Sequence, residues 1–218
     1  MKFLSRIKEL IPGKKTPVSL SAKVTPEMLA AAIVYAAGSH VKGIENNLRQ
    51  FEQSVGSDFP LPDLESDAGF RTLEESITAL WAFAHTRVVE HFQDGVTTNL
   101  YHTLLVPELA KLASGCGIPL TEEKLREAWR LYSPHSSSPP SKEEVLKAYS
   151  KYVIVPDIVE NCDDRAVFTL NIFHARVLRA LGLNIKSNFI LCEGLLTVNG
   201  TFLVEFRKLM EKTEPALG

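Results

Sequence analysis

Helix-start signals recur along this chain, and each stands before a stretch with helical apolar spacing. Thr25, Pro26 and Glu27 combine an N-cap residue, proline at the first helical position and an acid near the positive end of the helix dipole. Similar signals recur at Thr72 with Glu75, at Thr121, and at Ser141 with Glu144. Together they predict an all-α fold, a bundle of about seven to nine helices.

The longest predicted helix spans 26–55. Its apolar residues repeat at alternating three- and four-residue spacing, as in a helix-packing seam: Val41, Ile44, Leu48, Phe51 and Val55. Ala32, Ala36, Ser39 and Gly43 form a second, narrow stripe of small residues. We expect a central core helix, with a dimerisation face as the alternative. The other predicted helices span 73–94, 97–114 (kinked or divided at Pro107), 122–132, 141–153 and 164–181.

The last 35 residues fit two structures. Asn199-Gly200 can join two helices or form the turn of a small C-terminal β-hairpin. Apolar residues from Phe202 to Met210 have helical spacing, so two helices are favoured. Residues 133–141, rich in serine and proline, are the clearest linker. We expect an arm and tether over 1–24 and a single helical domain over 25–218, with a sub-boundary at 133–141.

The composition is that of an ordinary globular protein. The chain has 218 residues, of which 45% are apolar and 23% charged, so it can bury a sizeable core without a metal or disulfide. Its three cysteines are widely spaced, which argues against a disulfide framework or a zinc cluster and favours a reducing compartment. The longest uncharged run, Met28–Val41, is shorter than the roughly 20 residues that span a bilayer. We expect a cytoplasmic protein.

Charge is divided unevenly between the N-terminus and the rest of the chain. Residues 1–24 carry six basic side chains and one acid, a net charge of +5, whereas residues 25–218 carry −7. Residues 2–11 have an amphipathic helical pattern. Its apolar face consists of Phe3, Leu4, Ile7, Leu10 and Ile11, and the basic side chains beside it are Lys2, Arg6 and Lys8.

This pattern predicts a basic amphipathic arm that binds a surface. The surface can be a protein partner, a second copy of the chain, its own body, or the inner surface of a membrane, where docking of so short a segment is weak and peripheral. Nucleic acid is disfavoured, because the body is acidic and the arm has no aromatic residue besides Phe3. The sequence therefore favours a non-enzymatic interaction or scaffold protein.

Histidines provide the alternative hypothesis. His91 and His174 point into the apolar faces of their predicted helices, Asp94 follows His91, and His102 lies on the next helix. Inward histidines and a carboxylate could hold a metal ion or form an acid–base site in a helical bundle enzyme. However, the Glu-x-x-His pair of di-iron bundles and the His-Glu-x-x-His zinc motif are absent. Nucleophile-elbow and phosphate-loop motifs are also missing, so no cofactor is predicted.

Overall fold

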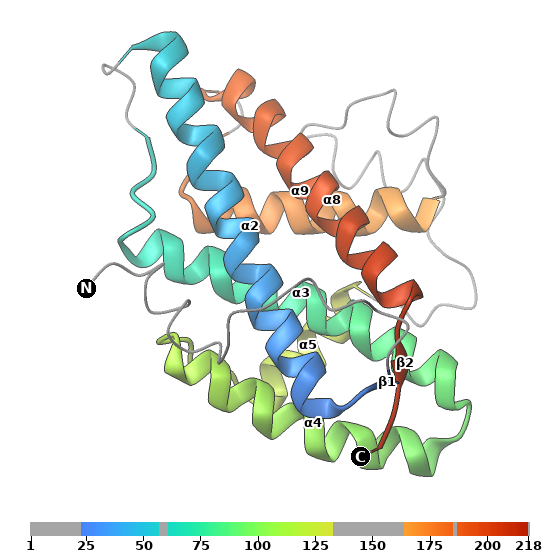
Figure 1. The fold of residues 1–218 in the computed structure, drawn as a ribbon. Coiled ribbons are helices and arrows are strands. Elements are labelled where there is room, and N and C mark those ends of the chain that lie inside the picture. The colour runs from blue at the N-terminus through green and yellow to red at the C-terminus, as the bar shows by residue number, and fades with distance from the viewer. Residues whose placement is uncertain (1–22, 57–60, 133–163, 185–186, 218) are drawn as a thin grey trace.

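The computed structural model describes residues 23–56, 61–132, 164–184 and 187–217. They form six helices and a two-stranded parallel sheet (Figure 1). The helices are α2 (Pro26–Val55), α3 (Asp67–Phe92), α4 (Gly95–Gly115), α5 (Glu122–Tyr132), α8 (Asp164–Ala180) and α9 (Phe189–Glu211). The strands are β1 (Lys23–Val24) and β2 (Glu214–Pro215). The predicted helical fold is confirmed, but the count of seven to nine helices is not. Residues 1–22, the linker and the helix expected at 141–153 lie outside the described residues.

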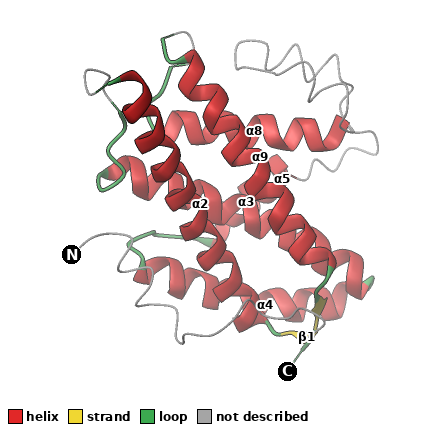
Figure 2. Cartoon of the chain, turned by 45° about the horizontal axis from the view of Figure 1, so that its top comes forward, coloured by secondary structure: helices red, strands yellow, loops and turns green. Residues whose placement is uncertain are grey.

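Helix α3 is the central element of the described bundle, because it contacts all five of the other described helices. Helix α2 packs against α3, α4 and α9. In Figure 1, α2 and α9 lie in front of α3 and α8, and Figure 2 shows the short strand pair at one edge, close to α4. The largest fully buried side chains come from these packed faces: Leu29, Ile33, Ile44, Leu73, Ile77, Leu80, Tyr101, Leu105, Leu109, Ile118, Leu125 and Phe173.

The boundaries of α2 agree with the sequence signals. Thr25 Oγ1 accepts a hydrogen bond from the Met28 amide at 3.4 Å, and Gly56 ends the helix with a φ of 89° that favours glycine. The predicted stripe of small residues contributes to packing. A Cβ at Gly43 would lie 3.5 Å from Val198 Cγ1, an ordinary van der Waals contact, so Gly43 faces α9. Helix α2 is therefore a core helix, as expected, but the central position belongs to α3.

Helix α3 begins before the predicted start. Ser66 is its N-cap, and the Ser66 hydroxyl accepts a hydrogen bond from the Ala68 amide at 3.3 Å. Thr72, predicted as a cap with Glu75, lies inside the helix and donates its hydroxyl to the Ala68 carbonyl at 2.7 Å. The capping-box prediction was wrong, because Ser66 and Asp67 provide the same chemistry one and a half turns earlier.

Helix α9 runs unbroken through Asn199-Gly200, so the predicted helix break and the alternative hairpin were both wrong. The Asn199 side chain is fully buried and makes hydrogen bonds to other helices, which outweighs its turn preference. Among the described helices, α9 alone is long and apolar enough to cross a membrane, by length and composition only. It packs one face on α2, α3 and α8, as a core helix does.

Strand β1, which directly precedes α2, is fixed to the folded body at a defined place. Strand β1 pairs with β2 in the parallel register Lys23↔Glu214 and Val24↔Pro215. The Tyr101 hydroxyl of α4 donates a hydrogen bond to the Val24 carbonyl at 2.9 Å. Lys23 and Val24, which the sequence analysis included in the arm segment, therefore belong to the folded body, and the arm starts beside α4.

Candidate functional site

A chain of hydrogen-bonded polar side chains crosses the core between four helices. Nδ1 of His40 (α2) lies 2.8 Å from Oγ of Ser76 (α3), and Nε2 of His40 lies 2.8 Å from Oδ1 of Asn199 (α9). Nδ2 of Asn199 lies 2.8 Å from Nδ1 of His174 (α8). None of these four residues is more than 3% exposed. We call His40, Ser76, Asn199 and His174 the buried histidine network.

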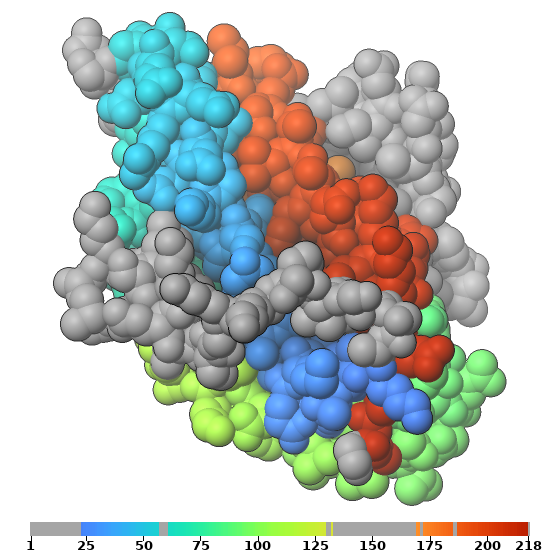
Figure 3. Space-filling view, in the orientation of Figure 1, coloured from blue at the N-terminus to red at the C-terminus, as the bar shows by residue number. Residues whose placement is uncertain are grey.

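Aromatic rings surround the network. The His40 ring stacks on Phe202 with a centroid distance of 4.1 Å and an interplanar angle of 16°, and its centroid lies 5.3 Å from that of Phe173. Figure 3 shows the side chains of α2 and α9 meeting along the face of the molecule seen there. The network is therefore sealed from solvent by the packing of its own helices.

Hydrogen positions follow from the partners of each group. The Ser76 hydroxyl lies 2.7 Å from the Thr72 carbonyl and 2.8 Å from His40 Nδ1, and its one hydrogen goes to Nδ1 when His40 is neutral and protonated on Nε2. Nε2–H of His40 then donates to Oδ1 of Asn199. Nδ2 of Asn199 donates in turn to the bare Nδ1 of His174. In this arrangement each of the three hydrogen bonds has one donor and one acceptor, and both imidazoles are neutral.

Burial keeps the two imidazoles neutral near pH 7. It lowers the pKa of His40 to about 4, against a smaller opposing effect of the Asn199 hydrogen bond, and lowers the pKa of His174 to about 4. Nε2 of His174 is buried and has no hydrogen-bond partner among the described residues. The network can hold four helices in register and respond to acid, but no substrate reaches it without opening the bundle.

The residues proposed for a metal site lie in different surroundings. His174 belongs to the network. His91 is exposed in the last turn of α3, with its ring edge-on to Phe92 at 5.0 Å. Asp94 caps α4, accepting the Thr97 amide hydrogen at 2.7 Å, a bond that lowers the pKa of its carboxyl. Within the described ranges, no group of three or more His, Cys, Asp or Glu side chains could hold a metal ion.

His102 belongs to a cluster of aromatic side chains between α3, α4 and α5. Its ring centroid is 4.1 Å from that of His85 and 6.4 Å from that of Trp81, and the His85 ring lies edge-on to Trp129 at 4.5 Å. Burial lowers the pKa of His102 to about 4, and neither of its ring nitrogens has a hydrogen-bond partner in the described part of the chain. Here the histidine packs as a neutral aromatic ring.

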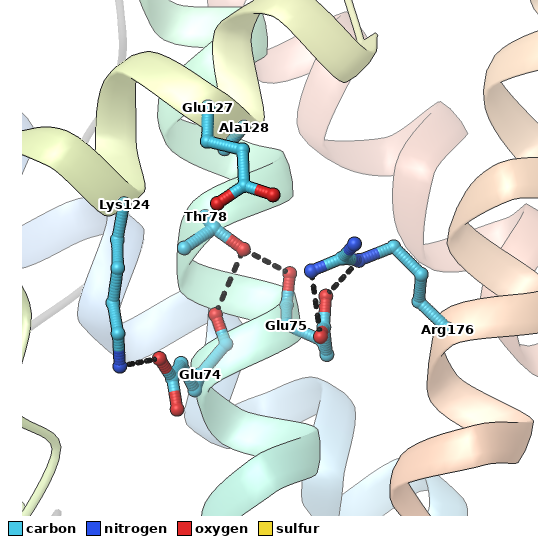
Figure 4. A pocket seen from close by; sticks show the side chains of 7 residues that line it. All are labelled: Glu74, Glu75, Thr78, Lys124, Glu127, Ala128 and Arg176. Atoms are coloured by element: carbon cyan, nitrogen blue, oxygen red, sulfur yellow. Dashed lines mark hydrogen bonds and ion pairs between the residues drawn. The ribbon is translucent and has the colours of Figure 1, made fainter.

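A small charged pocket lies between α3, α5 and α8 (Figure 4). It has a volume of about 120 Å³ and is lined by Glu74, Glu75, Thr78, Lys124, Glu127, Ala128 and Arg176. Glu74 pairs with Lys124 of α5, and the adjacent Glu75 makes two hydrogen bonds of 2.5 and 2.9 Å to Arg176 of α8. Two consecutive glutamates of α3 thus bind two different helices, and the pocket is closed by ion pairs that hold the bundle together.

Sequence reasoning found one member of the network and missed three. His174 lies at the centre of an apolar arc, which is a local signal. His40 sits within an uncharged run that was interpreted only as core, and Asn199 was interpreted as a turn residue. The uncharged run around His40 is the signal that could have identified His40 as a network residue, because a lone polar ring on a buried face needs a hydrogen-bond partner.

The arm residues predicted to bind a surface lie outside the described residues: Lys2, Phe3, Leu4, Arg6, Ile7, Lys8, Leu10 and Ile11. Comparisons with protein-family models, with curated proteins and with solved structures found no match for this chain. The function therefore has to be argued from the chain's own residues.

Proposed function

We propose that this chain is a non-enzymatic helical interaction protein that docks its basic amphipathic arm on a protein surface. The observation that carries the proposal is the charge division, +5 on residues 1–24 against −7 on the remainder, together with the apolar face of residues 3–11. The arm's basic face suits an acidic partner surface, and its apolar face supplies the area that binding requires.

The described body supports this reading in two ways. Its β1 segment is held by β2 and by Tyr101, so the arm leaves the bundle at a defined point rather than from a frayed end. Its two most buried histidines are at most 3% exposed, so they have the surroundings of structural groups rather than of groups that meet a substrate.

A protein surface fits the arm better than a membrane does. A free helix of about ten residues is marginal in water, so the arm orders only when its apolar face is covered. Each basic residue near an anionic leaflet contributes about 1 kcal/mol, and the short apolar face adds little because only part of it would be buried. Membrane docking is therefore weak and salt-sensitive, whereas a protein partner or a second copy can cover the whole face.

A pair of aspartate substitutions tests the proposal in the full-length chain. Ile7→Asp puts a charge in the centre of the apolar face, whereas the matched control Ser5→Asp adds the same charge on the opposite face. We expect Ile7→Asp to abolish arm-dependent assembly in light scattering, or co-sedimentation with a candidate partner, while the helical circular dichroism of the body is kept. Ser5→Asp should retain both. Equal behaviour of the two variants would contradict the proposal, and loss of binding only to phosphatidylserine vesicles would assign the arm to a membrane.

A second candidate, metal binding through inward histidines, has one observation in its favour. Nε2 of His174 is buried and lacks a hydrogen-bond partner among the described residues, so one ligand atom is available. If it serves a metal, the purified protein should retain stoichiometric zinc or copper that His174→Ala releases and His91→Ala, an exposed control, does not. Metal-free protein that survives chelation unchanged would contradict this candidate.

A further inference from the structure

The outer face of α4 is uncharged although it faces solvent, and large apolar side chains are exposed on it beside Asn99 and Thr103. From Gly95 to Pro107 the helix contains no Asp, Glu, Lys or Arg. Its inner side is in the core, whereas Val96, Leu100 and Leu104 are 82%, 49% and 43% exposed. These three residues follow one another at four-residue spacing and so form a line about 12 Å long. We call them the α4 ridge.

A solvent-facing ridge of this kind is a docking surface, because an ordinary surface helix carries charged residues opposite its buried face. The place where the described chain begins indicates what covers it. The described chain begins at β1, and the Val24 carbonyl accepts its hydrogen bond from Tyr101, the residue that follows Leu100. Figure 1 shows β1 alongside α4 at one edge of the molecule.

The connecting segment is long enough to reach the ridge. Residues 12–22 comprise 11 residues, and a chain of that length can span up to about 36 Å. A helix with its side chains is about 10 Å across, so this tether can pass from the buried side of α4 to its outer side. The arm helix of residues 2–11 would be about 15 Å long, similar to the ridge.

The chemistry of the two surfaces is complementary. Five apolar side chains of the arm match a ridge that has no charge of its own. Two exposed acids lie just before α4: Glu90, which also pairs with Arg87 at 4.0 Å, and Asp94, which also caps α4. The basic arm residues Lys2, Arg6 and Lys8 can pair with these acids.

We propose that residues 3–11 pack on the α4 ridge of the same chain and are held there until a partner takes the arm. The same chain is favoured over a second copy for two reasons. Covalent attachment through a short connection gives the arm a high effective concentration at the ridge, whereas a second copy must arrive from solution. A ridge of three side chains is also much smaller than the roughly 800 Å² per partner of a standard stable interface. This inference rests on the proposed function, since it names the resting position of the same binding element.

Limited trypsin digestion of the full-length protein tests the contact. Cleavage after Arg6 reports the arm, cleavage after Lys15 reports the tether, and a synthetic peptide of residues 1–22 gives the rates of the free segment. We expect cleavage after Arg6 to be about tenfold slower than in the peptide, which corresponds to a contact of about 1.4 kcal/mol, while Lys15 is cleaved at the free rate. Leu100→Asp should remove this protection, whereas Asn99→Asp, an exposed neighbour off the ridge, should keep it.

Several outcomes would overturn the inference. Cleavage after Arg6 at the peptide rate, or protection that persists in Leu100→Asp, excludes the ridge. Protection that rises with protein concentration, together with a dimer mass in light scattering, assigns the arm to a second copy. If Leu100→Asp disturbs the circular dichroism of the body, Val96→Asp, at the most exposed ridge position, gives the same test. If the arm drives assembly but the bond after Arg6 is not protected, only this inference is refuted. If that bond is protected but no assembly is seen, only the proposed function is refuted.

Discussion

The buried histidine network should make this protein sensitive to mild acid. Lowering the pH from 7 to 5 puts protons on the histidines of an unfolded chain, whose pKa is about 6.5. In the folded chain, burial lowers the pKa of both His40 and His174 to about 4, so they stay neutral at pH 5. The unfolded state therefore binds more protons, and the free energy of unfolding falls as the pH falls.

The size of the effect follows from these pKa values. For one histidine, the difference in proton binding between the two states amounts to about 2 kcal/mol between pH 7 and pH 5. Two such groups give about 4 kcal/mol, a large share of the 5–15 kcal/mol that holds a typical domain folded. The stabilisation is fully present above pH 6.5 and is lost progressively toward pH 4 and below.

Urea unfolding followed by circular dichroism at several pH values measures this dependence. The wild-type curve should lose about 4 kcal/mol between pH 7 and 5, plus a contribution of the same sign from His102, whose pKa burial also lowers to about 4. His174→Gln should reduce the pH dependence by about 2 kcal/mol whatever its stability at pH 7. A free energy of unfolding that is flat from pH 7 to 5 would refute the argument.

Other substitutions test the same structure. Asn199→Leu should destabilise the protein by about 2–4 kcal/mol in urea unfolding, because it leaves two buried ring nitrogens, His40 Nε2 and His174 Nδ1, without a partner. Asn199→Asp should instead raise the pKa of both histidines, through a carboxylate within hydrogen-bond distance of each, and weaken or reverse the acid sensitivity. Gly56→Ala should destabilise by about 1 kcal/mol through its φ of 89° alone, since nothing lies within 4 Å of an added Cβ. Gly95→Ala should not destabilise the protein, because the added Cβ meets equal free space and Gly95 has no positive φ.

Much of the fold could be predicted because its signals are local. The caps at Thr25 and Thr121 lie within three residues of the amides they satisfy, and the structure has both hydrogen bonds, to Met28 and to Lys124. The break expected at Asn199 failed for the opposite reason. Its hydrogen bond to His40 joins residues 159 positions apart, and no local pattern reports a partner at that distance.

The candidate site, too, could be predicted only where its signals are local. The inward position of His174 follows from helical spacing alone, but its surroundings depend on α9, which the sequence analysis divided in two. Ser76 looks like one of many serines on a helix, and its role appears only when His40 is placed 2.8 Å away from it. Spacing within one helix therefore identifies a buried face, whereas the partners across that face come from tertiary packing.

The polar network also selects one arrangement of apolar helices. Leucine and valine side chains can repack with modest losses, so an apolar interface alone permits neighbouring registers. Sliding α9 by one residue would turn Asn199 by about 100° and break both of its hydrogen bonds. His40 Nε2 and His174 Nδ1 would then be buried without partners, at about 1–3 kcal/mol each. No such penalty attaches to a slip at Leu195 or Leu203, so the register of α9 on α2 and α8 is set by an amide between two imidazoles.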